Sequence, residues 1–149
     1  MAVREVLQKD EDILRKSSKE VKVFDEKLEN LLDDMWQTMY AYNGMGLAAP
    51  QVGILKRIVV MDVNNMKLEL VNPIIVSSNG EDIEEEGCLS CGKIRGKVKR
   101  PMCVTVKAKD RYGYDFTITG EKYLARCLCH EIDHLNGILF IDKMLKNKE

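Results

Sequence analysis

Two histidines four residues apart are the side chains whose spacing most directly predicts chemistry. They are His130 and His134, the only histidines of the 149-residue chain, and Glu131 lies between them in an H-E-x-x-H pattern. Positions i and i+4 of a helix share one face, so both imidazoles can coordinate the same ion. Glu131 would then lie within reach of a water at that ion. The pattern predicts metal-assisted hydrolysis, and the alternative is a polar helix with two hydrogen-bonded histidines.

A catalytic site of this kind takes three protein ligands and keeps one position open, so another segment must supply the third ligand. No histidine follows His134, and Gly137 is followed by Ile, Leu and Phe, unlike the longer H-E-x-x-H-x-x-G-x-x-H pattern of metzincins. The remaining candidates are upstream acids and cysteines, among them Cys88, which forms a C-x-x-C pair with Cys91.

The cysteines permit two interpretations of another class. A structural zinc site could use Cys88, Cys91, Cys127 and Cys129, but C-x-C is not the usual zinc spacing, and such a site would leave H-E-x-x-H without a role. A thiol-redox protein would place C-x-x-C at a helix start near a βαβ unit, and no such pattern appears.

The composition is that of an ordinary globular protein, with 45% apolar residues, 32% charged residues and a net charge of −1. A general nucleic-acid binder would be basic, so no nucleic-acid partner is expected. No apolar run approaches the roughly 18 residues of a membrane span, and the charges of MAVREVLQKD are unlike a signal peptide. We therefore expect a cytoplasmic protein without membrane contact, whose five cysteines stay reduced.

Apolar periodicity predicts the elements that position these residues, beginning with a helix over 25–42. Asp25 is its predicted N-cap and Asn43–Gly44 its stop. The predicted buried face consists of Leu28, Leu31, Leu32, Met35, Trp36, Met39 and Tyr42. Residues 44–53 contain three glycines and a proline, which predicts an irregular segment.

Enrichment in Val and Ile, and alternation of apolar with polar residues, predict the strands. They are expected at 57–63, 68–78, 98–110 and 114–120, with a turn at 79–82. Val104 and Val106 are expected to point inward.

A second helix is predicted over 120–136, capped by Thr119 and ended by Asn136–Gly137, with a short helical turn at 142–145. Helices and strands are segregated along the chain, which indicates an α+β fold with antiparallel pairing. The length suits a single domain spanning 1–149.

Two basic stretches are expected to be solvated surface. One is the segment KIRGKVKR at 93–100 and the other is the tail with Lys143, Lys146 and Lys148.

Three segments, GMGLAAPQ at 44–51, EGCLS at 86–90 and HEIDH at 130–134, together resemble the signature motifs of peptide deformylases, in the same order. The resemblance extends from the first helix to about Lys143. It implies antiparallel β-sheets packed around a central metal-binding helix that carries HEIDH, with an N-terminal amphipathic helix. It also implies that Cys88, His130 and His134 are the ligands of one divalent metal ion, most often Fe²⁺, with Zn²⁺, Ni²⁺ or Co²⁺ as alternatives.

The resemblance implies a hydrolase of protein biosynthesis that removes the N-formyl group of N-formyl-Met nascent peptides and releases formate. Glu131 would be the general base and acid, while the Gln51 side chain and the Leu89 backbone N–H would bind the oxyanion. The Gly46 region would pair with the extended substrate. The residues expected to bind substrate are Gly44, Met45, Gly46, Glu86, Gly87, Tyr123, Arg126 and Cys127. An Arg100–Asp133 pair would orient the helix motif.

The chain departs from the family pattern at several positions. Cys91–Gly92 replaces an aliphatic residue and proline, Arg126 replaces an apolar residue near the pocket, and Cys129 replaces a glutamine. A transient ribosome contact is a further implied partner, although the sequence ends at MLKNKE, without the long basic C-terminal helix that some relatives use for docking. A metallopeptidase acting on unformylated peptides is the remaining alternative.

Overall fold

The computed structural model describes residues 2–146, and over that range two α-helices flank a series of antiparallel strands along the chain. The α-helices are α1 (Glu26–Ala41) and α2 (Tyr123–Leu135). The strands are β1 (Gly46–Ala48), β2 (Ile58–Val63), β3 (Met66–Asn79), β4 (Asp82–Glu86), β5 (Gly96–Arg100), β6 (Cys103–Lys109) and β7 (Asp115–Glu121). Short 3-10 helices are η1 (Asp12–Arg15), η2 (Ala49–Val52), η3 (Leu89–Cys91) and η4 (Phe140–Asp142).

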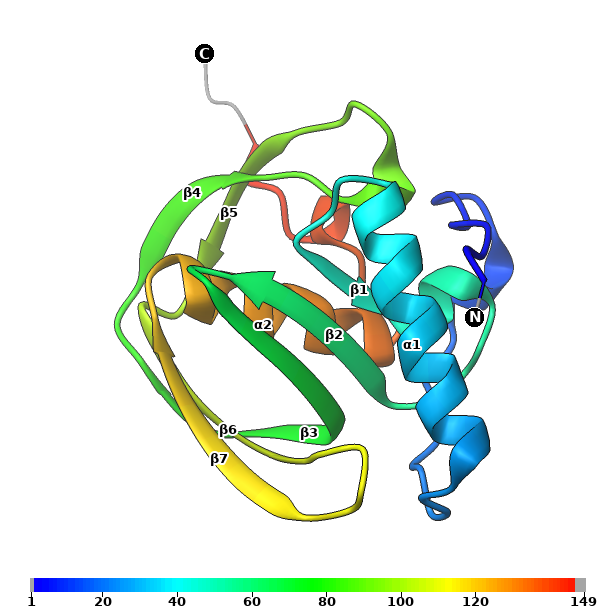
Figure 1. Ribbon diagram of the computed structural model, residues 1–149. Coiled ribbons are helices and arrows are strands. Elements are labelled where there is room, and N and C mark those ends of the chain that lie inside the picture. The colour runs from blue at the N-terminus through cyan, green and yellow to red at the C-terminus, as the bar shows by residue number, and fades with distance from the viewer. Residues whose placement is uncertain (1, 147–149) are drawn as a thin grey trace.

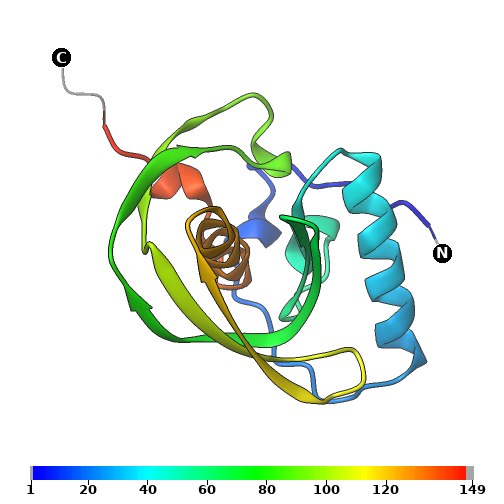
Figure 2. The same cartoon turned by 60° about the vertical axis from the view of Figure 1, so that its left-hand side comes forward.

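Five strands form one antiparallel sheet in the order β1-β2-β3-β6-β7, and β4 pairs with β5. The sheet curls around α2, which is seen almost end-on inside it in Figure 2. Helix α1 packs on the opposite side of β1 and β2 (Figure 1). The predicted α+β class, with antiparallel sheets around the helix that carries HEIDH, is confirmed.

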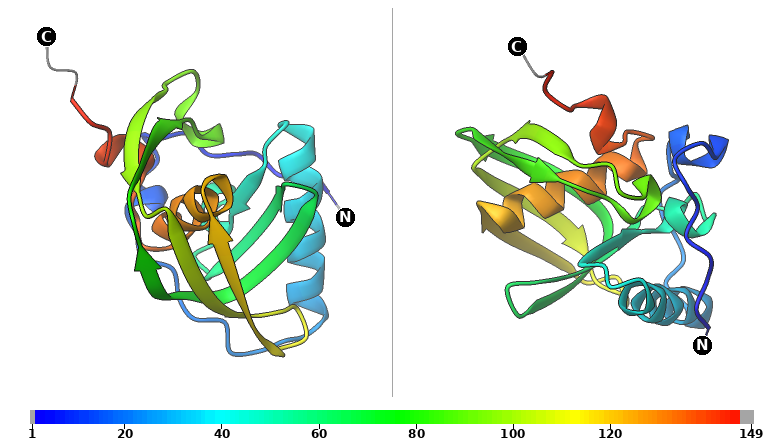
Figure 3. Two further views of the ribbon diagram at one scale, coloured as in Figure 1. Left: turned by 90° about the vertical axis from the view of Figure 1, so that its left-hand side faces the viewer. Right: turned by 90° about the horizontal axis from the view of Figure 1, so that it is seen from above.

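Strand β2 shows why the sheet is covered on both sides. Val59, Met61 and Val63 pack in the cluster that contains α2, whereas Ile58 and Val60 pack in the cluster that contains α1. Successive side chains of a strand point to opposite faces, so one strand serves both clusters. The right-hand view of Figure 3 shows β1 and β2 between the two helices.

Helix α1 confirms the predicted cap and most of the predicted face. The side chain of Asp25 accepts a hydrogen bond from the Leu28 N–H at 3.2 Å. Trp36 is only partly buried, and Tyr42 is 40% exposed. Tyr42 lies at the C-cap, beyond the last helical turn, and its hydroxyl accepts the Val6 N–H instead of entering the core.

Residues 44–53 are more regular than predicted, because β1 pairs with β2 and η2 follows directly. The predicted strand 98–110 is interrupted at Pro101 and Met102, which separate β5 from β6. Strand β4 was not predicted, since four of its five residues are acidic.

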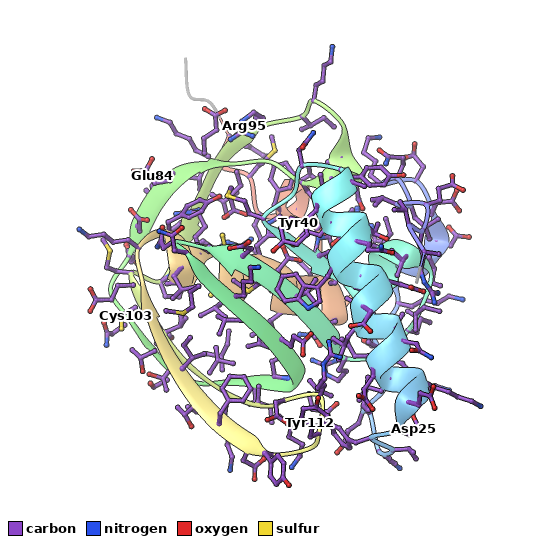
Figure 4. All side chains as sticks on the ribbon, viewed as in Figure 1. Asp25, Tyr40, Glu84, Arg95, Cys103 and Tyr112 are labelled. Carbon is purple, nitrogen blue, oxygen red and sulfur yellow. The ribbon has the colours of Figure 1, made fainter. Side chains whose placement is uncertain are left out.

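The pairs β3–β6 and β4–β5 form one long ribbon with a break. Asn79 pairs with Cys103 before the break, and Asp82 pairs with Arg100 after it, so the register is unchanged. Gly80 lies in the break with φ of +71°, where a side chain would also approach Met102. The part beyond the break, residues 82–100, is called the β4–β5 arm. Glu84 and Arg95 mark this arm in Figure 4, far from Tyr112 at the opposite end of the molecule.

Helix α2 begins later than predicted. Thr119 belongs to β7, where its hydroxyl bonds to that of Thr105, so the predicted cap is wrong. The helix instead follows Lys122, whose φ is +54°. The predicted end is confirmed, because Asn136 is the C-cap and Gly137 has φ of +74°.

The remaining predictions concern the tail and the surface. The short helical turn expected at 142–145 lies at η4 instead. Within the basic stretches, Arg95 pairs with Glu85 and Lys143 with Asp133, while Lys148 lies outside the described residues. Among the helices that the structure describes, none has the length and apolarity of a membrane span.

Candidate metal centre and active site

Helix α2 and the segment after β4 bring three potential metal ligands together. Ligand atoms of Cys88, His130 and His134 all lie within 4.8 Å of one another. The distance from Cys88 Sγ to His134 Nε2 is 3.3 Å. Zinc-like ions sit about 2.3 Å from sulfur and about 2.0 Å from nitrogen, which places two tetrahedral ligands about 3.5 Å apart. The observed spacing fits such an ion.

The two imidazoles differ in how they are held. His130 Nδ1 lies 2.9 Å from Glu86 Oε1, which leaves Nε2 available as a ligand atom. Burial opposes a charge on His130, but the hydrogen bond with Glu86 raises its pKa overall. Burial lowers the pKa of His134, which keeps that ring neutral, and its Nδ1 has no hydrogen-bond partner in residues 2–146. A thiolate and two neutral imidazoles are a donor set for a divalent transition metal.

The other cysteines do not join this group. Cys91 is buried with Leu14, Val98 and Phe140, while Cys129 belongs to the core cluster of the larger sheet. No second group of three potential ligands occurs in the described part of the chain. The structural zinc site of four cysteines is therefore not formed.

Glu131 lies beside the three ligands with its carboxylate buried. Its Oε2 is 4.0 Å from His130 Nε2, and burial raises its pKa to about 7. Gly46 of β1 lies directly against this carboxylate, and any Cβ at position 46 would overlap the Glu131 oxygen. Glycine permits this close approach, and a residue with a Cβ at position 46 would force the Glu131 carboxylate to move.

Gln51 and Leu89 face the ligands from the other side. The Gln51 Oε1 accepts the Ala48 N–H at 2.9 Å, and its Nε2 lies 3.0 Å from Ser90 Oγ and 3.6 Å from Cys88 Sγ. Leu89 is the first residue of η3, so its N–H has no partner within that helix. Ser90, which holds the Gln51 amide, was not predicted from the sequence.

A cavity of about 340 Å³ opens onto these residues, a size typical of small-ligand sites. Every residue predicted to bind substrate lines it, together with Gln51, Cys88, Leu89, His130 and Glu131, whereas His134 is not part of the lining.

Tyr123 donates to Met45 Sδ at 3.6 Å, and both residues line the cavity. Burial raises the pKa of Cys127 to about 12, so its thiol is a neutral wall. Lys93 and Arg95 at the rim were not predicted.

Glu86 and Arg126 both line the cavity, and their charged ends also bind within the protein. Glu86 accepts hydrogen bonds from Arg100, Arg126 and His130. Burial alone would raise the pKa of Glu86, but the bonds with His130 and Arg100 hold it well below its usual range. The guanidinium of Arg126 donates to protein acceptors on β4 and β5. The predicted Arg100–Asp133 pair is confirmed, with an N–O distance of 2.6 Å.

Comparisons with known proteins agree with this geometry. The family model for polypeptide deformylase matches residues 3–149. A peptide deformylase of Acetivibrio thermocellus is 56% identical over 146 residues, which cover 98% of this chain and 86% of the relative. One of Caldicellulosiruptor bescii is 53% identical over 146 residues, covering 98% and 88%.

Solved structures of similar proteins have the same fold. The peptide deformylase of Thermotoga maritima superposes with a TM-score of 0.94 at 40% identity, covering 97% of this chain and 99% of that one. That of Legionella pneumophila gives a TM-score of 0.93 at 49% identity, covering 96% and 86%. The chain therefore belongs to the polypeptide deformylase family.

Proposed function

We propose that this member of the family removes the formyl group from N-formylmethionyl peptides by hydrolysis, with Glu131 as the group that moves the proton. The observation that carries the proposal is the placement of the buried Glu131 carboxylate beside three converging ligand atoms, at one wall of an open cavity. The reaction breaks the formyl C–N bond, adds the elements of water, and yields formate and a free amine.

The proposed metal ligands are Cys88, His130 and His134. Their donor set fits ferrous iron, which we propose as the ion, and it also accepts zinc, nickel or cobalt. When bound, such an ion supplies Lewis acidity that lowers the pKa of water and polarises a carbonyl.

The proposed role of Glu131 is to accept a proton from the attacking water and deliver it to the leaving nitrogen. Its burial against Gly46 favours this role, because a carboxyl whose pKa is raised to about 7 can both accept and donate a proton near neutral pH. The Gln51 amide and the Leu89 N–H are proposed to donate hydrogen bonds to the oxyanion. Gln51 is pre-oriented for this task by Ser90 and the Ala48 N–H.

The substrate is proposed to add to the edge of the larger sheet. Strand β1 is the edge strand, so the side that faces away from β2 is available to an extended peptide. Met45, Tyr123 and Cys127 are proposed to surround the methionine side chain. The neutral thiol of Cys127 suits an apolar wall.

Formate release by purified protein, prepared without oxygen in the presence of ferrous iron, tests the proposal. We expect release from formyl-Met-Ala and no cleavage of Met-Ala, which a metallopeptidase would hydrolyse. Glu131→Ala and the isosteric Glu131→Gln should each lower the rate at least about a hundredfold, because positioned proton transfer contributes at least that factor. Activity that survives in Glu131→Ala would contradict the assigned role.

The setting of the reaction remains a prediction. We propose that residues 1–149 act as one catalytic domain on nascent chains in the cytoplasm.

A further inference from the structure

We propose that Arg126 is a positioning residue that docks the β4–β5 arm on α2 and thereby sets the Cys88 thiol opposite the two histidines. The inference rests on the metal-ligand set of the proposed function. It gives a role to a residue that the sequence suggested would face the substrate.

The guanidinium of Arg126 reaches from α2 to both strands of the arm. Its Nη2 donates to the Asp82 carbonyl of β4 at 2.8 Å, and its Nη1 donates to the Val98 carbonyl of β5 at the same distance. Nη1 also donates to Glu86 Oε2 at 2.6 Å. The side chain is 3% exposed. A planar fork can satisfy acceptors on two strands at once, which the point charge of a lysine cannot.

Glu86 connects this fork to the metal centre. One carboxylate oxygen accepts Arg126 and the other faces His130 Nδ1, and the two helix residues are one turn apart. The carboxylate therefore fixes the position of β4 along α2, because a shift of the arm would lengthen one of these bonds. Cys88 follows Glu86 by two residues, so the same contact fixes the thiol relative to His130 and His134.

Arg100 supports the same contact between the arm and α2, but from the side of the arm. It belongs to β5, donates to both Glu86 oxygens, and reaches Asp133 on α2. The buried Glu86 carboxylate is thus held by one arginine from the helix and one from the arm. Removal of Arg126 would leave the Asp82 and Val98 carbonyls without this donor and would loosen the arm on its helix side.

The test is metal affinity, measured by competition of zinc or cobalt between a chelator and the purified protein. Arg126→Met should weaken binding about 10–100-fold, the usual effect of losing a residue that orients ligands. Arg126→Lys keeps the charge without the fork and should weaken it by a smaller factor. Circular dichroism of the metal-free protein will show whether Arg126→Met folds. If it does not, the metal affinity of Arg126→Lys is the test.

Arg111→Met is the matched control. Arg111 also bridges two carboxylates, Glu69 and Asp33, but it lies away from the metal centre. The Arg111→Met variant should have a lower thermal stability but a metal affinity within about twofold of wild type, since Glu69 and Asp33 contact no proposed ligand. Equal loss of affinity in Arg111→Met, or wild-type affinity in both Arg126 variants, would overturn the inference.

The absorption spectrum of the cobalt-loaded protein gives a second readout that a merely stabilising role would not move. At saturating cobalt, the thiolate charge-transfer and ligand-field bands should shift in Arg126→Met and stay unchanged in Arg111→Met. Neither measurement uses a formylated peptide. If the protein releases no formate but shows these shifts, the proposed activity is contradicted and the role of Arg126 is supported. If the enzyme is active but its Arg126 variants match wild type, only the role of Arg126 is contradicted.

Discussion

The backbone of Gly46 and the carboxylate of Glu131 form the tightest packing constraint around the proposed proton-transfer group. A methyl group at position 46 would overlap both the oxygen and the carboxyl carbon of Glu131. We expect Gly46→Ala to turn this carboxylate away and to lower kcat/KM for formate release by about a hundredfold or more, the contribution of a positioned acid–base group. Metal content, measured by atomic emission, should stay at the wild-type value, because Cys88, His130 and His134 do not contact position 46. Loss of metal in this variant would show that the glycine serves the ligands instead.

Cys88 and Cys91 look equivalent in the sequence, and in the structure both pack on the same apolar cluster with a side-chain hydrogen bond between them, but only Cys88 also joins the two histidines. Cys88 joins the two histidines, whereas Cys91 is 3% exposed in an apolar cluster with Val98 and Phe140. We expect Cys91→Ser to retain one equivalent of metal and to lose about 1–2 kcal/mol of stability, the cost of burying a hydroxyl. Cys88→Ser should lose the metal. The measurement is metal stoichiometry together with urea unfolding, and loss of metal from Cys91→Ser would revive the structural zinc interpretation.

The site residues differ in how far the sequence could identify them. The helical spacing of His130, Glu131 and His134 already restricts their geometry, whereas Cys88 was identified as a proposed ligand only through the family resemblance of its motif. Apart from the Arg100–Asp133 pair, the polar contacts between separate elements, such as those of Ser90, Glu86 and Arg126, were not inferred, because such a contact depends on the folded distance. A motif therefore identifies candidate metal-ligand atoms, but it does not identify which charged groups pair with one another in the folded protein.

At the scale of elements, Asn72 marks an irregularity in β3, next to the point where pairing with β2 ends and pairing with β6 begins. Asn72 has φ of +53°, and its side chain makes two hydrogen bonds with the backbone of Val21. The pairing of β3 with β6 shifts register between Val71 and Ile74, as a bulge does. We expect Asn72→Ala to lower the free energy of unfolding by about 3 kcal/mol, since each bond contributes about 1 and positive φ in alanine about 1.

Asn72→Gly separates the two contributions in the same urea experiment. Glycine lacks the hydrogen bonds and tolerates positive φ, so this variant should be about 1 kcal/mol more stable than Asn72→Ala. Equal stability of the two variants would show that backbone strain plays no part at Asn72.

The elements were predictable where local pattern and tertiary environment agree. Helix α1 has a strong helical periodicity that its buried face matches, and β2 is an apolar, Val-rich run that is buried on both faces. Four of the five residues of β4 are acidic, which no local strand pattern would predict, and β4 pairs along its length with β5. The break at Pro101 and Met102 was also not visible, since alternation continues across it and the register on both sides is the same. Pairing with a distant strand, which decides both cases, is not a local property.

At the scale of the whole molecule, the proposed metal centre joins two parts of the chain that are remote in sequence. Cys88 belongs to the arm, in the segment between β4 and β5, whereas His130 and His134 belong to the helix enclosed by the larger sheet. An ion bound by all three would cross-link the arm to that helix in the folded state alone. The joint would then depend on both the ion and the contacts of Arg100, Arg126 and Glu86.

Removal of the metal should therefore lower the stability of the whole protein. An ion present at a thousandfold excess over its Kd stabilises the folded state by about 4 kcal/mol, which is about 10 °C in Tm for a chain of this size. We expect a chelator to lower the Tm of wild type by this amount and to leave that of Cys88→Ser unchanged. Hydrogen exchange should increase at residues 86–91 and 126–134 before it increases in α1, because α1 packs on the far side of β2. If the chelator lowers the Tm of wild type and of Cys88→Ser equally, the ion binds elsewhere. If hydrogen exchange increases equally in all elements, the ion does not act at the contact between the arm and α2.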